Sequence, residues 1–303
     1  MIIVPNLDSN EVSINWINDV KCKRFDLPLF FNNTIKYSDI IQGSIGSCWF
    51  LATLISYLRP SNKNNEDRVN DIMNSIKLYR DDSIRKIYKV RIDKRYYIVD
   101  DYVLKSYYDS YKSNLTPKCI WYILLEKAML CHMTQKESRD FVKDGDTYYV
   151  KNIIVTSGEM NSGALGLNYL VGGSPRYYYL HLKDKRPGGN IINSLDIYRK
   201  FKRGEHILAN THRRTYPSGI FKDTGSPSLN GAASSHCYCI IDMEYSKDKK
   251  TYLLTICNPW RQKEISQSKG TYIYPPGIFP GEGVSIITWE RFQYLFACVH
   301  ITG

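Results

Sequence analysis

The sequence lacks a long apolar run, because no stretch approaches the roughly 20 consecutive apolar residues that a membrane-spanning helix requires. Its first residues, Met1–Pro5, form an apolar segment that is too short for a secretory signal. We therefore expect no membrane span and a cytoplasmic, intracellular location.

Regular cysteine spacing is also missing. The eight cysteines form neither a disulfide-like framework nor the paired Cys-x-x-Cys knuckles of a zinc site. This pattern argues against a small disulfide-stapled domain and against a zinc finger. The simplest interpretation is a set of free thiols in a reducing compartment.

Acidic residues are fewer than basic ones, which gives a formal net charge of +11. In the densest basic window, Lys77–Arg95, the charges alternate with Tyr88, Val90 and Ile92, as in a strand with one solvated face. We therefore expect no nucleic acid partner. The alternative, nucleic-acid binding through this hairpin, predicts a steep salt dependence.

A glycine-flanked cysteine opens a predicted helix in the run Gln42–Trp49, which reads Gln-Gly-Ser-Ile-Gly-Ser-Cys-Trp. Apolar residues then recur at offsets of three and four until Arg59–Pro60, and Ser47 is the expected N-cap. A helix N-terminus favours negative charge, which predicts a lowered pKa and a nucleophilic thiol for Cys48. The Gln42 amide and the Cys48 N–H are expected to form an oxyanion hole.

A cysteine nucleophile needs a base, and His236 has the most informative surroundings of the six histidines. It opens a strand-like stretch, and a second strand, Thr251–Cys257, leads to Asn258-Pro259-Trp260. A hairpin centred on Lys247 would place residues 236 and 258 opposite each other. The Asn258 amide oxygen would then fix the imidazole tautomer, and Trp260 would shield that bond from water.

These residues resemble the calpain-type cysteine proteases, whose sites combine a Gln-Gly-x-x-Gly-x-Cys-Trp block, a later histidine and an Asn-Pro-Trp triplet. Further stretches that look like the same family are residues 98–101, 121–128, 169–173 and 289–296. The resemblance implies that Cys48 is the nucleophile, His236 the general base and acid, Asn258 the orienting residue and Gln42 an oxyanion donor. It implies an intracellular endopeptidase that hydrolyses protein substrates through a Cys48 thioester.

The resemblance also implies two calcium sites. Asp39 and Glu126 match carboxylates of the first site, and Glu264 matches one ligand of the second, where Thr271 and Val284 replace carboxylates. Calcium needs six to eight oxygen ligands. We therefore expect no obligatory cofactor, with calcium as an optional one, and a regulatory partner protein as another source of control.

Four departures from the family pattern lie beside the site. Ser47 replaces aspartate, Ser235 replaces the glycine before the histidine, Cys257 replaces a basic or polar residue, and Arg261 replaces glycine, but none of these changes removes a reacting group. They leave open an alternative in which the chain is a catalytically inactive, calpain-like binding module. A transglutaminase-like acyltransferase is a further alternative, although it typically has aspartate where Asn258 stands.

The 303 residues with 43% hydrophobic content supply core for two domains, and the predicted helices and strands together give an expected α+β fold. By resemblance it is papain-like, with a helical N-terminal lobe over residues 1–182 that carries the nucleophile helix. A β-rich C-terminal lobe over residues 183–303 carries the His236 and Asn258 hairpin and a final aromatic strand. The active cleft is expected between the lobes.

Overall fold

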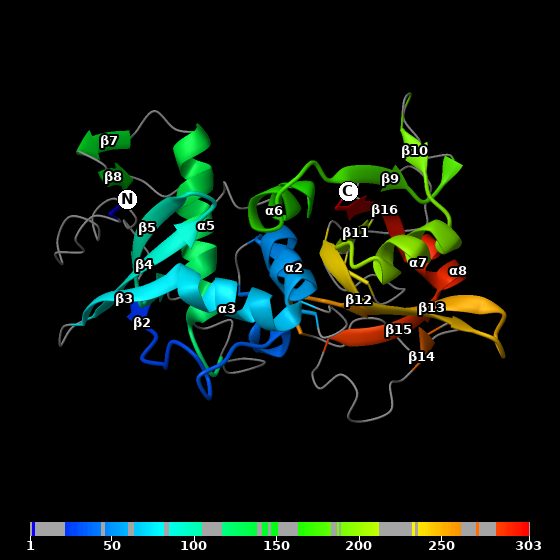
Figure 1. Cartoon of the computed structure of the whole chain (residues 1–303), viewed down its shortest axis with the longest axis horizontal. Helices are drawn as coiled ribbons and strands as arrows, with labels where there is room; N and C mark the ends of the chain where they lie inside the picture. Colours follow the sequence, from blue (N-terminus) through cyan, green and yellow to red (C-terminus); the bar gives the residue numbers. More distant parts are fainter. Residues whose placement is uncertain are drawn as a thin grey trace. The chain divides into compact units, whose positions relative to one another are not determined.

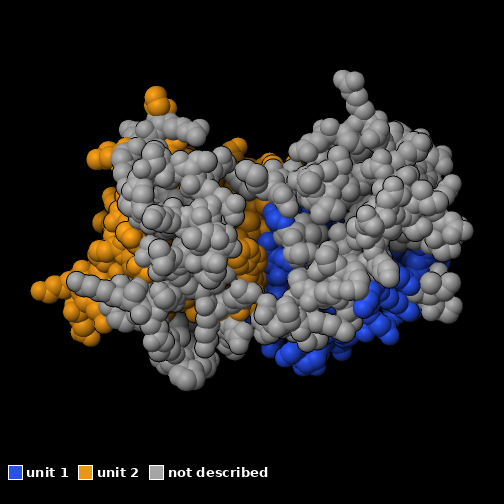
Figure 2. Space-filling model, turned by 180° about the vertical axis from the view of Figure 1, so that it is seen from behind, with its two compact units in different colours: residues 1–47, 66–159 blue, residues 48–65, 160–303 orange. Residues whose placement is uncertain are grey.

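The computed structural model describes residues 2–3, 22–43, 46–59, 64–81, 85–104, 117–137, 141–144, 147–150, 163–182, 187, 189–211, 232–233, 236–261, 271–272 and 283–302. The chain divides into two compact units, which Figure 2 colours separately. The first unit comprises residues 1–47 and 66–159, and the second comprises residues 48–65 and 160–303.

The first unit is built on a sheet of six strands. Its elements are β1 (Ile2–Ile3), β2 (Cys22–Arg24), η1 (Tyr37–Asp39), α3 (Asn65–Ser75), β3 (Ile76–Asp81), β4 (Lys86–Ile92), β5 (Arg95–Asp100), β6 (Tyr102–Leu104), α5 (Trp121–Glu137), β7 (Phe141–Asp144) and β8 (Thr147–Val150). The strand order is β3-β4-β5-β1-β8-β7, and β2 pairs separately with β6. The apolar residues of β4 are buried, and α5 packs against β4 and β5 (Figure 1).

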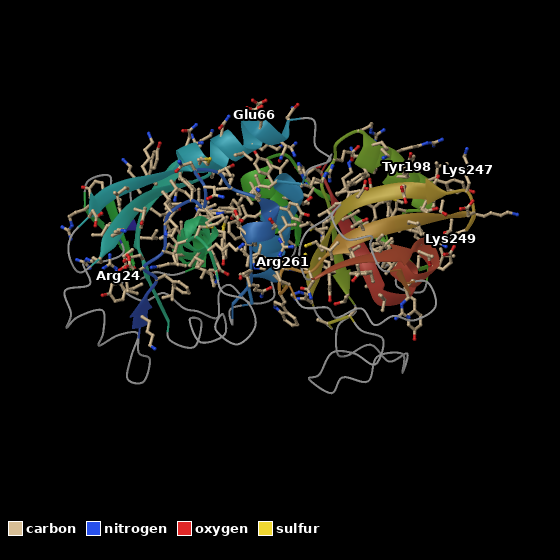
Figure 3. All side chains as sticks on the ribbon, turned by 90° about the horizontal axis from the view of Figure 1, so that it is seen from below. Arg24, Glu66, Tyr198, Lys247, Lys249 and Arg261 are labelled. Atoms are coloured by element: carbon tan, nitrogen blue, oxygen red, sulfur yellow. The ribbon has the colours of Figure 1, made fainter. Side chains whose placement is uncertain are left out.

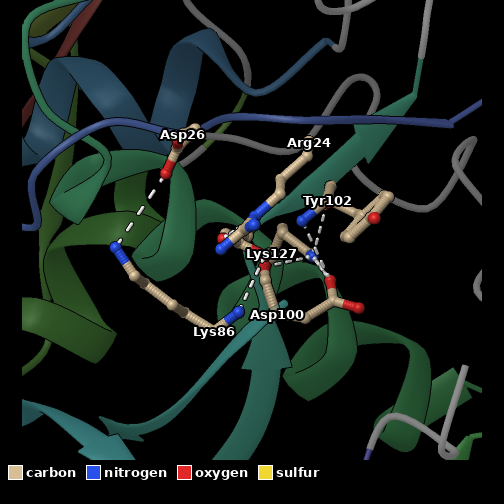
Figure 4. Close-up of polar contacts among 7 residues, drawn as sticks. Arg24, Asp26, Lys86, Asp100, Tyr102 and Lys127 are labelled. Atoms are coloured by element: carbon tan, nitrogen blue, oxygen red, sulfur yellow. Dashed lines mark hydrogen bonds and ion pairs between the residues drawn. The ribbon is translucent and has the colours of Figure 1, made fainter. Parts of the chain in front are cut away.

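A part-buried ion pair ties this sheet to α5, and a second one joins β2 to the end of β5 (Figure 4). Lys127 Nζ lies 2.6 Å from Asp100 Oδ1 and donates to the carbonyl oxygens of Asp100 and Tyr102, each at 2.7 Å. Arg24 Nε donates to Asp101 Oδ2 at 2.8 Å. Since the three N–H groups of an ammonium meet three acceptors here, the charge of Lys127 is compensated where α5 meets the end of β5.

The second unit is built on a sheet of eight strands. Its elements are α2 (Cys48–Tyr57), α6 (Gly163–Leu170), β9 (Arg176–Tyr179), β10 (Asn190–Ile191), α7 (Ser194–Lys202), β11 (Ile207–Thr211), β12 (Cys237–Ser246), β13 (Thr251–Cys257), β14 (Thr271–Tyr272), β15 (Val284–Thr288), α8 (Trp289–Leu295) and β16 (Phe296–Ile301). The strand order is β10-β9-β16-β11-β12-β13-β15-β14.

The two faces of this sheet are covered by different helices. Tyr238, Ile240 and Val299 belong to the core formed with α7 and α8. On the opposite face, α2 and α6 pack against β11, and α2 also packs against β12 (Figure 1). Successive side chains of a strand point to opposite faces, so Cys237 and Cys239 lie on the face of α2 and α6.

The structure confirms the α+β class but differs from the expected lobes. The first unit, expected to be helical, contains the six-stranded sheet as well as α3 and α5. The predicted boundary at residue 182 also differs from the division into units, because α2 and α6 pack on the second sheet. The predicted final strand corresponds to β16, which follows helix α8; Thr288 Oγ1 caps that helix by accepting a hydrogen bond from Arg291 N.

The predicted hairpin register is also wrong by a few residues. The ladder pairs Cys239 with Cys257 and Ser246 with Thr251, with an irregularity between Ile240 and Asp242. Residues 236 and 258 are therefore not direct ladder partners.

In the part of the chain that the structure describes, no helix combines the length and the apolar character needed to cross a bilayer.

Candidate active site

Cys48 is the first residue of α2, as predicted, and it is partly exposed. The following residues, 49–56, are all buried, so the helix is enclosed on every side and not on one face only. Glycine makes the close packing of α6 on α2 possible. A Cβ at Gly166 would lie 2.4 Å from Thr53 Oγ1 and 3.1 Å from the Trp49 carbonyl oxygen.

The environment of Cys48 differs from the one expected from the helix N-terminus. Burial raises the pKa of the Cys48 thiol, while hydrogen bonding from the backbone of Cys237 and of Trp49 acts in the opposite direction. The interaction with the Cys237 backbone places Cys48 beside the residue that follows His236. The thiol of the resting protein is therefore protonated at neutral pH.

His236 and Asn258 meet as predicted, although the ladder register differs. His236 Nε2 and Asn258 Oδ1 are 2.8 Å apart, and both residues are buried. The Trp260 ring lies over the imidazole with 4.1 Å between ring centroids, and the Trp260 N–H donates to Asn258 Oδ1 at 3.0 Å. The amide oxygen thus accepts two hydrogen bonds, and the tautomer with Nε2 protonated leaves His236 Nδ1 as a base.

Backbone contacts fix His236 at the start of β12. Its N–H donates to Thr211 Oγ1 at 3.0 Å, and its carbonyl oxygen accepts from Thr211 N at 3.0 Å. Burial lowers the pKa of His236 to about 4, and the hydrogen bond with Asn258 opposes that shift. The imidazole is therefore neutral at pH 7, which is the form that a general base requires.

The turn after Asn258 depends on a left-handed backbone. Arg261 has φ +59°, its N–H donates to the Asn258 carbonyl oxygen at 3.0 Å, and its side chain is buried. Gly283 O accepts from Asn258 N at 2.9 Å, and a Cβ on Gly283 would lie 2.6 Å from Arg261 Cα. A positive φ accounts for glycine being the usual residue at the position of Arg261 in the family that the sequence resembles.

Gln42, the predicted oxyanion donor, is buried in the first unit. Cys48 belongs to the second unit. The oxyanion hole formed by Gln42 and the Cys48 N–H therefore stays a prediction.

The predicted ligands of the first calcium site have protein partners. Asp39 Oδ2 accepts from Lys36 N at 2.8 Å and from Trp121 Nε1 at 3.3 Å. Glu126 is buried and accepts a hydrogen bond from the Ser47 hydroxyl. Burial raises the pKa of Glu126 to about 8, so its carboxyl group is largely neutral at pH 7.

A neutral carboxyl group is a poor calcium ligand, so a calcium ion at the first site would require Glu126 to lose its proton. Glu264, predicted for the second site, lies outside the described residues. Among the residues that are described, no group of three or more His, Cys, Asp or Glu side chains could hold a metal ion. Calcium binding stays a prediction without support from these contacts.

Two features of the site were not predicted. One is the pairing of Ser47 with Glu126, which are 79 positions apart; no local pattern in the sequence indicates it. The other is the contact of Arg261 with Cys257, whose sulfur lies 3.4 Å from Arg261 Nη1. The signal for this second contact was present, because both residues are departures from the family pattern.

A cysteine at the start of a buried helix, in one unit with a hydrogen-bonded His–Asn pair, has the components of a cysteine peptidase site. Residues 2–148 match the family model described as calpain family cysteine protease. This match covers just under half of the 303 residues and supports a calpain-type catalytic core and, at the family level, a cysteine peptidase. A comparison with curated proteins gave no match.

Proposed function

We propose that the protein is a calpain-like cysteine endopeptidase of papain-like, two-lobed architecture that cleaves protein substrates inside the cell. Cys48 is the nucleophile, His236 the general base and acid, Asn258 the orienting residue and Gln42 an oxyanion donor. The single observation that carries this proposal is the 2.8 Å contact between His236 Nε2 and Asn258 Oδ1 in the unit that begins with Cys48. The family match includes Gln42 and Cys48, whereas His236 and Asn258 lie beyond it.

The proposed reaction is acyl transfer to sulfur. His236 takes the proton of the Cys48 thiol as the sulfur attacks a peptide carbonyl, and the resulting oxyanion binds to Gln42 and the Cys48 N–H. His236 then gives the proton to the leaving amine. Water, deprotonated by the same imidazole, hydrolyses the thioester and frees Cys48.

The charge state of the resting site shapes this mechanism. Burial raises the pKa of the Cys48 thiol and lowers that of His236, so both groups are neutral at pH 7. In the proposed mechanism the proton passes from the thiol to the imidazole as the sulfur attacks the carbonyl. Trp260, packed on the imidazole, limits the access of water to the His236–Asn258 bond.

The proposal is tested by cleavage of casein in reducing buffer, with calcium and with chelator, by the wild type and by Cys48→Ala. Cys131→Ala is a matched control, because Cys131 is a buried cysteine of α5 in the other unit. We expect cleavage by the wild type and the control and none by Cys48→Ala. Folded wild-type protein that neither cleaves casein nor reacts at Cys48 would instead identify the inactive binding module.

A further inference from the structure

Four cysteines gather on the sheet face that α2 and α6 cover. Asn210 of β11 pairs with Cys237 on one side and with Cys298 on the other, so these thiols share a face with it. Cys239 lies two residues after Cys237 on the same face and pairs with Cys257 of β13. We call Cys237, Cys239, Cys257 and Cys298 the thiol face.

Within the thiol face, Cys239 and Cys257 are direct partners. They lie opposite each other in antiparallel strands, and neither side chain is exposed. Cys239 Sγ lies 3.8 Å from the carbonyl oxygen of Cys257. Opposite residues in an antiparallel pair have Cα atoms about 4.5 or 5.5 Å apart, and both spacings fall within the range of about 4.4–6.8 Å that disulfides span.

A buried cation touches one member of this pair. Arg261 Nη1 lies 3.4 Å from Cys257 Sγ, and the arginine side chain is buried. In Figure 3, Arg261 is labelled near one end of hairpin β12–β13, far from Lys247 and Lys249 at its turn. The close approach of Gly283 to Arg261 Cα fixes the backbone from which this guanidinium extends.

These contacts make the two thiols chemically unequal. The hydrogen bond from Cys239 and the charge of Arg261 together lower the pKa of Cys257 to about 7, against the opposing effect of burial. Burial and the neighbouring Cys257 raise the pKa of Cys239. A thiolate next to a protonated thiol is the combination that thiol–disulfide chemistry uses, with Cys257 as the attacking sulfur and Cys239 as the resolving one.

We propose that Cys257 and Cys239 form a second reactive thiol site, separate from Cys48, which a small peroxide converts into a disulfide. The Cys257 thiolate attacks one peroxide oxygen, the O–O bond breaks, and hydroxide leaves with a Cys257 sulfenic acid remaining. The sulfur of Cys239 then attacks the sulfenic sulfur, the S–O bond breaks, and the departing hydroxide takes the Cys239 proton as water. Two thiols and one hydrogen peroxide thus give one disulfide and two waters.

The position of the pair links it to the candidate active site. Cys257 directly precedes Asn258, whose side chain holds His236. A bond from Cys257 to Cys239 would pull on the segment that positions Asn258, so the oxidised protein should be a slower peptidase. This consequence rests on the proposed function, whereas formation of the disulfide does not.

The test uses full-length Cys48→Ala protein, so that the candidate nucleophile cannot compete for the oxidant. The protein is treated with hydrogen peroxide, its remaining thiols are alkylated, and non-reducing peptide mass spectrometry maps the products. We expect a Cys239–Cys257 linked peptide that dithiothreitol removes. It should form at least about tenfold faster than any oxidation of Cys131, which is as fully buried as the pair but whose pKa is raised to about 12.

A second variant tests the first step of the reaction by itself, in which peroxide converts Cys257 into a sulfenic acid. In Cys48→Ala/Cys239→Ala protein the resolving thiol is missing, so a 1,3-diketone probe should trap the sulfenic acid on Cys257. Cys257 and Cys239 that stay reduced until Cys131 is oxidised would overturn the proposal, as would a disulfide from Cys257 to Cys237 or Cys298. Neither readout depends on peptidase activity, so a failure of the proposed function would leave both interpretable.

Discussion

Asn258 is the residue whose loss should affect catalysis with little change in the rest of the molecule. Asn258→Ala removes the acceptor that fixes His236, so we expect kcat/KM for casein to fall by roughly 10- to 100-fold. Asn193→Ala is the matched control, because Asn193 caps α7 through Asp196 N and should cost about 1 kcal/mol of stability without a loss of activity. Equal activity of the two variants at a temperature where both are folded would contradict the assigned role.

The imidazole of His236 should set the acid limb of the pH profile. Burial lowers its pKa to about 4, and the base is its neutral form, so activity should be lost only as the pH falls toward 4. The measurement is kcat/KM against pH with a soluble peptide, at pH values where circular dichroism shows folded protein. Half-maximal activity near the ordinary histidine value of about 6.5 would show that this imidazole is solvated in the working enzyme.

Glu126 should make the folded state sensitive to alkaline pH. Its pKa is raised to about 8 when folded and returns to about 4.5 when unfolded, so the folded state holds the proton more tightly between these values. Stability should therefore fall as the pH rises from 4.5 through 8. The variant Glu126→Gln keeps an acceptor for Ser47. Its free energy of unfolding, relative to that of the wild type, should rise by roughly 2 kcal/mol from pH 6 to pH 8.

Urea unfolding of the wild type and of Glu126→Gln at pH 6 and pH 8 measures this gain directly. The difference in unfolding free energy between the two proteins cancels the titration of the groups that they share. If the unfolding free energies of the two proteins change with pH in the same way, Glu126 is ionised in the folded protein. Such a result would also make it a better candidate for a calcium ligand.

At the scale of elements, the packing of α6 on α2 should be sensitive to one methyl group added at Gly166. A Cβ on Gly166 would lie 2.4 Å from Thr53 Oγ1 and 3.1 Å from the Trp49 carbonyl oxygen. Gly166→Ala should therefore cost about 1–3 kcal/mol in urea unfolding, although alanine is the better helix former. Adding Thr53→Ala should recover part of that loss, whereas a single variant as stable as the wild type would contradict this packing.

Local patterns predicted most elements that bear the site. The strand Thr251–Cys257 has the bounds expected from the sequence, and α2 begins at Cys48. The helix α8, which Thr288 caps, was not among the elements predicted from the sequence. The complete burial of α2 could not be read from its sequence, because it results from the sheet and helix packed on either side.

The candidate site was predictable to a similar extent. His236 and Asn258 were paired by a hairpin argument whose register was wrong, yet the two side chains meet because both flank the ladder that pairs Cys239 with Cys257. The raised pKa of Cys48 was not predicted, since a helix N-terminus indicates the opposite shift and burial depends on tertiary packing.

For the molecule as a whole, the family match and the folded units divide the chain differently. The match ends at residue 148, inside the first unit, while His236 and Asn258 lie in the second. Cys48 connects the two observations, because it is in the matched segment and folds with the second unit. A peptidase mechanism therefore requires that the matched cysteine and the unmatched His–Asn pair act as one site.

The most direct test of that claim is covalent labelling with a peptide that carries a thiol-reactive vinyl sulfone, followed by mass spectrometry of the intact and digested protein. We predict one adduct per chain, on Cys48, formed at least about 100-fold more slowly in His236→Ala than in the wild type or in Cys131→Ala. Adducts spread over other cysteines, or equal labelling rates with and without His236, would contradict a site built from Cys48, His236 and Asn258.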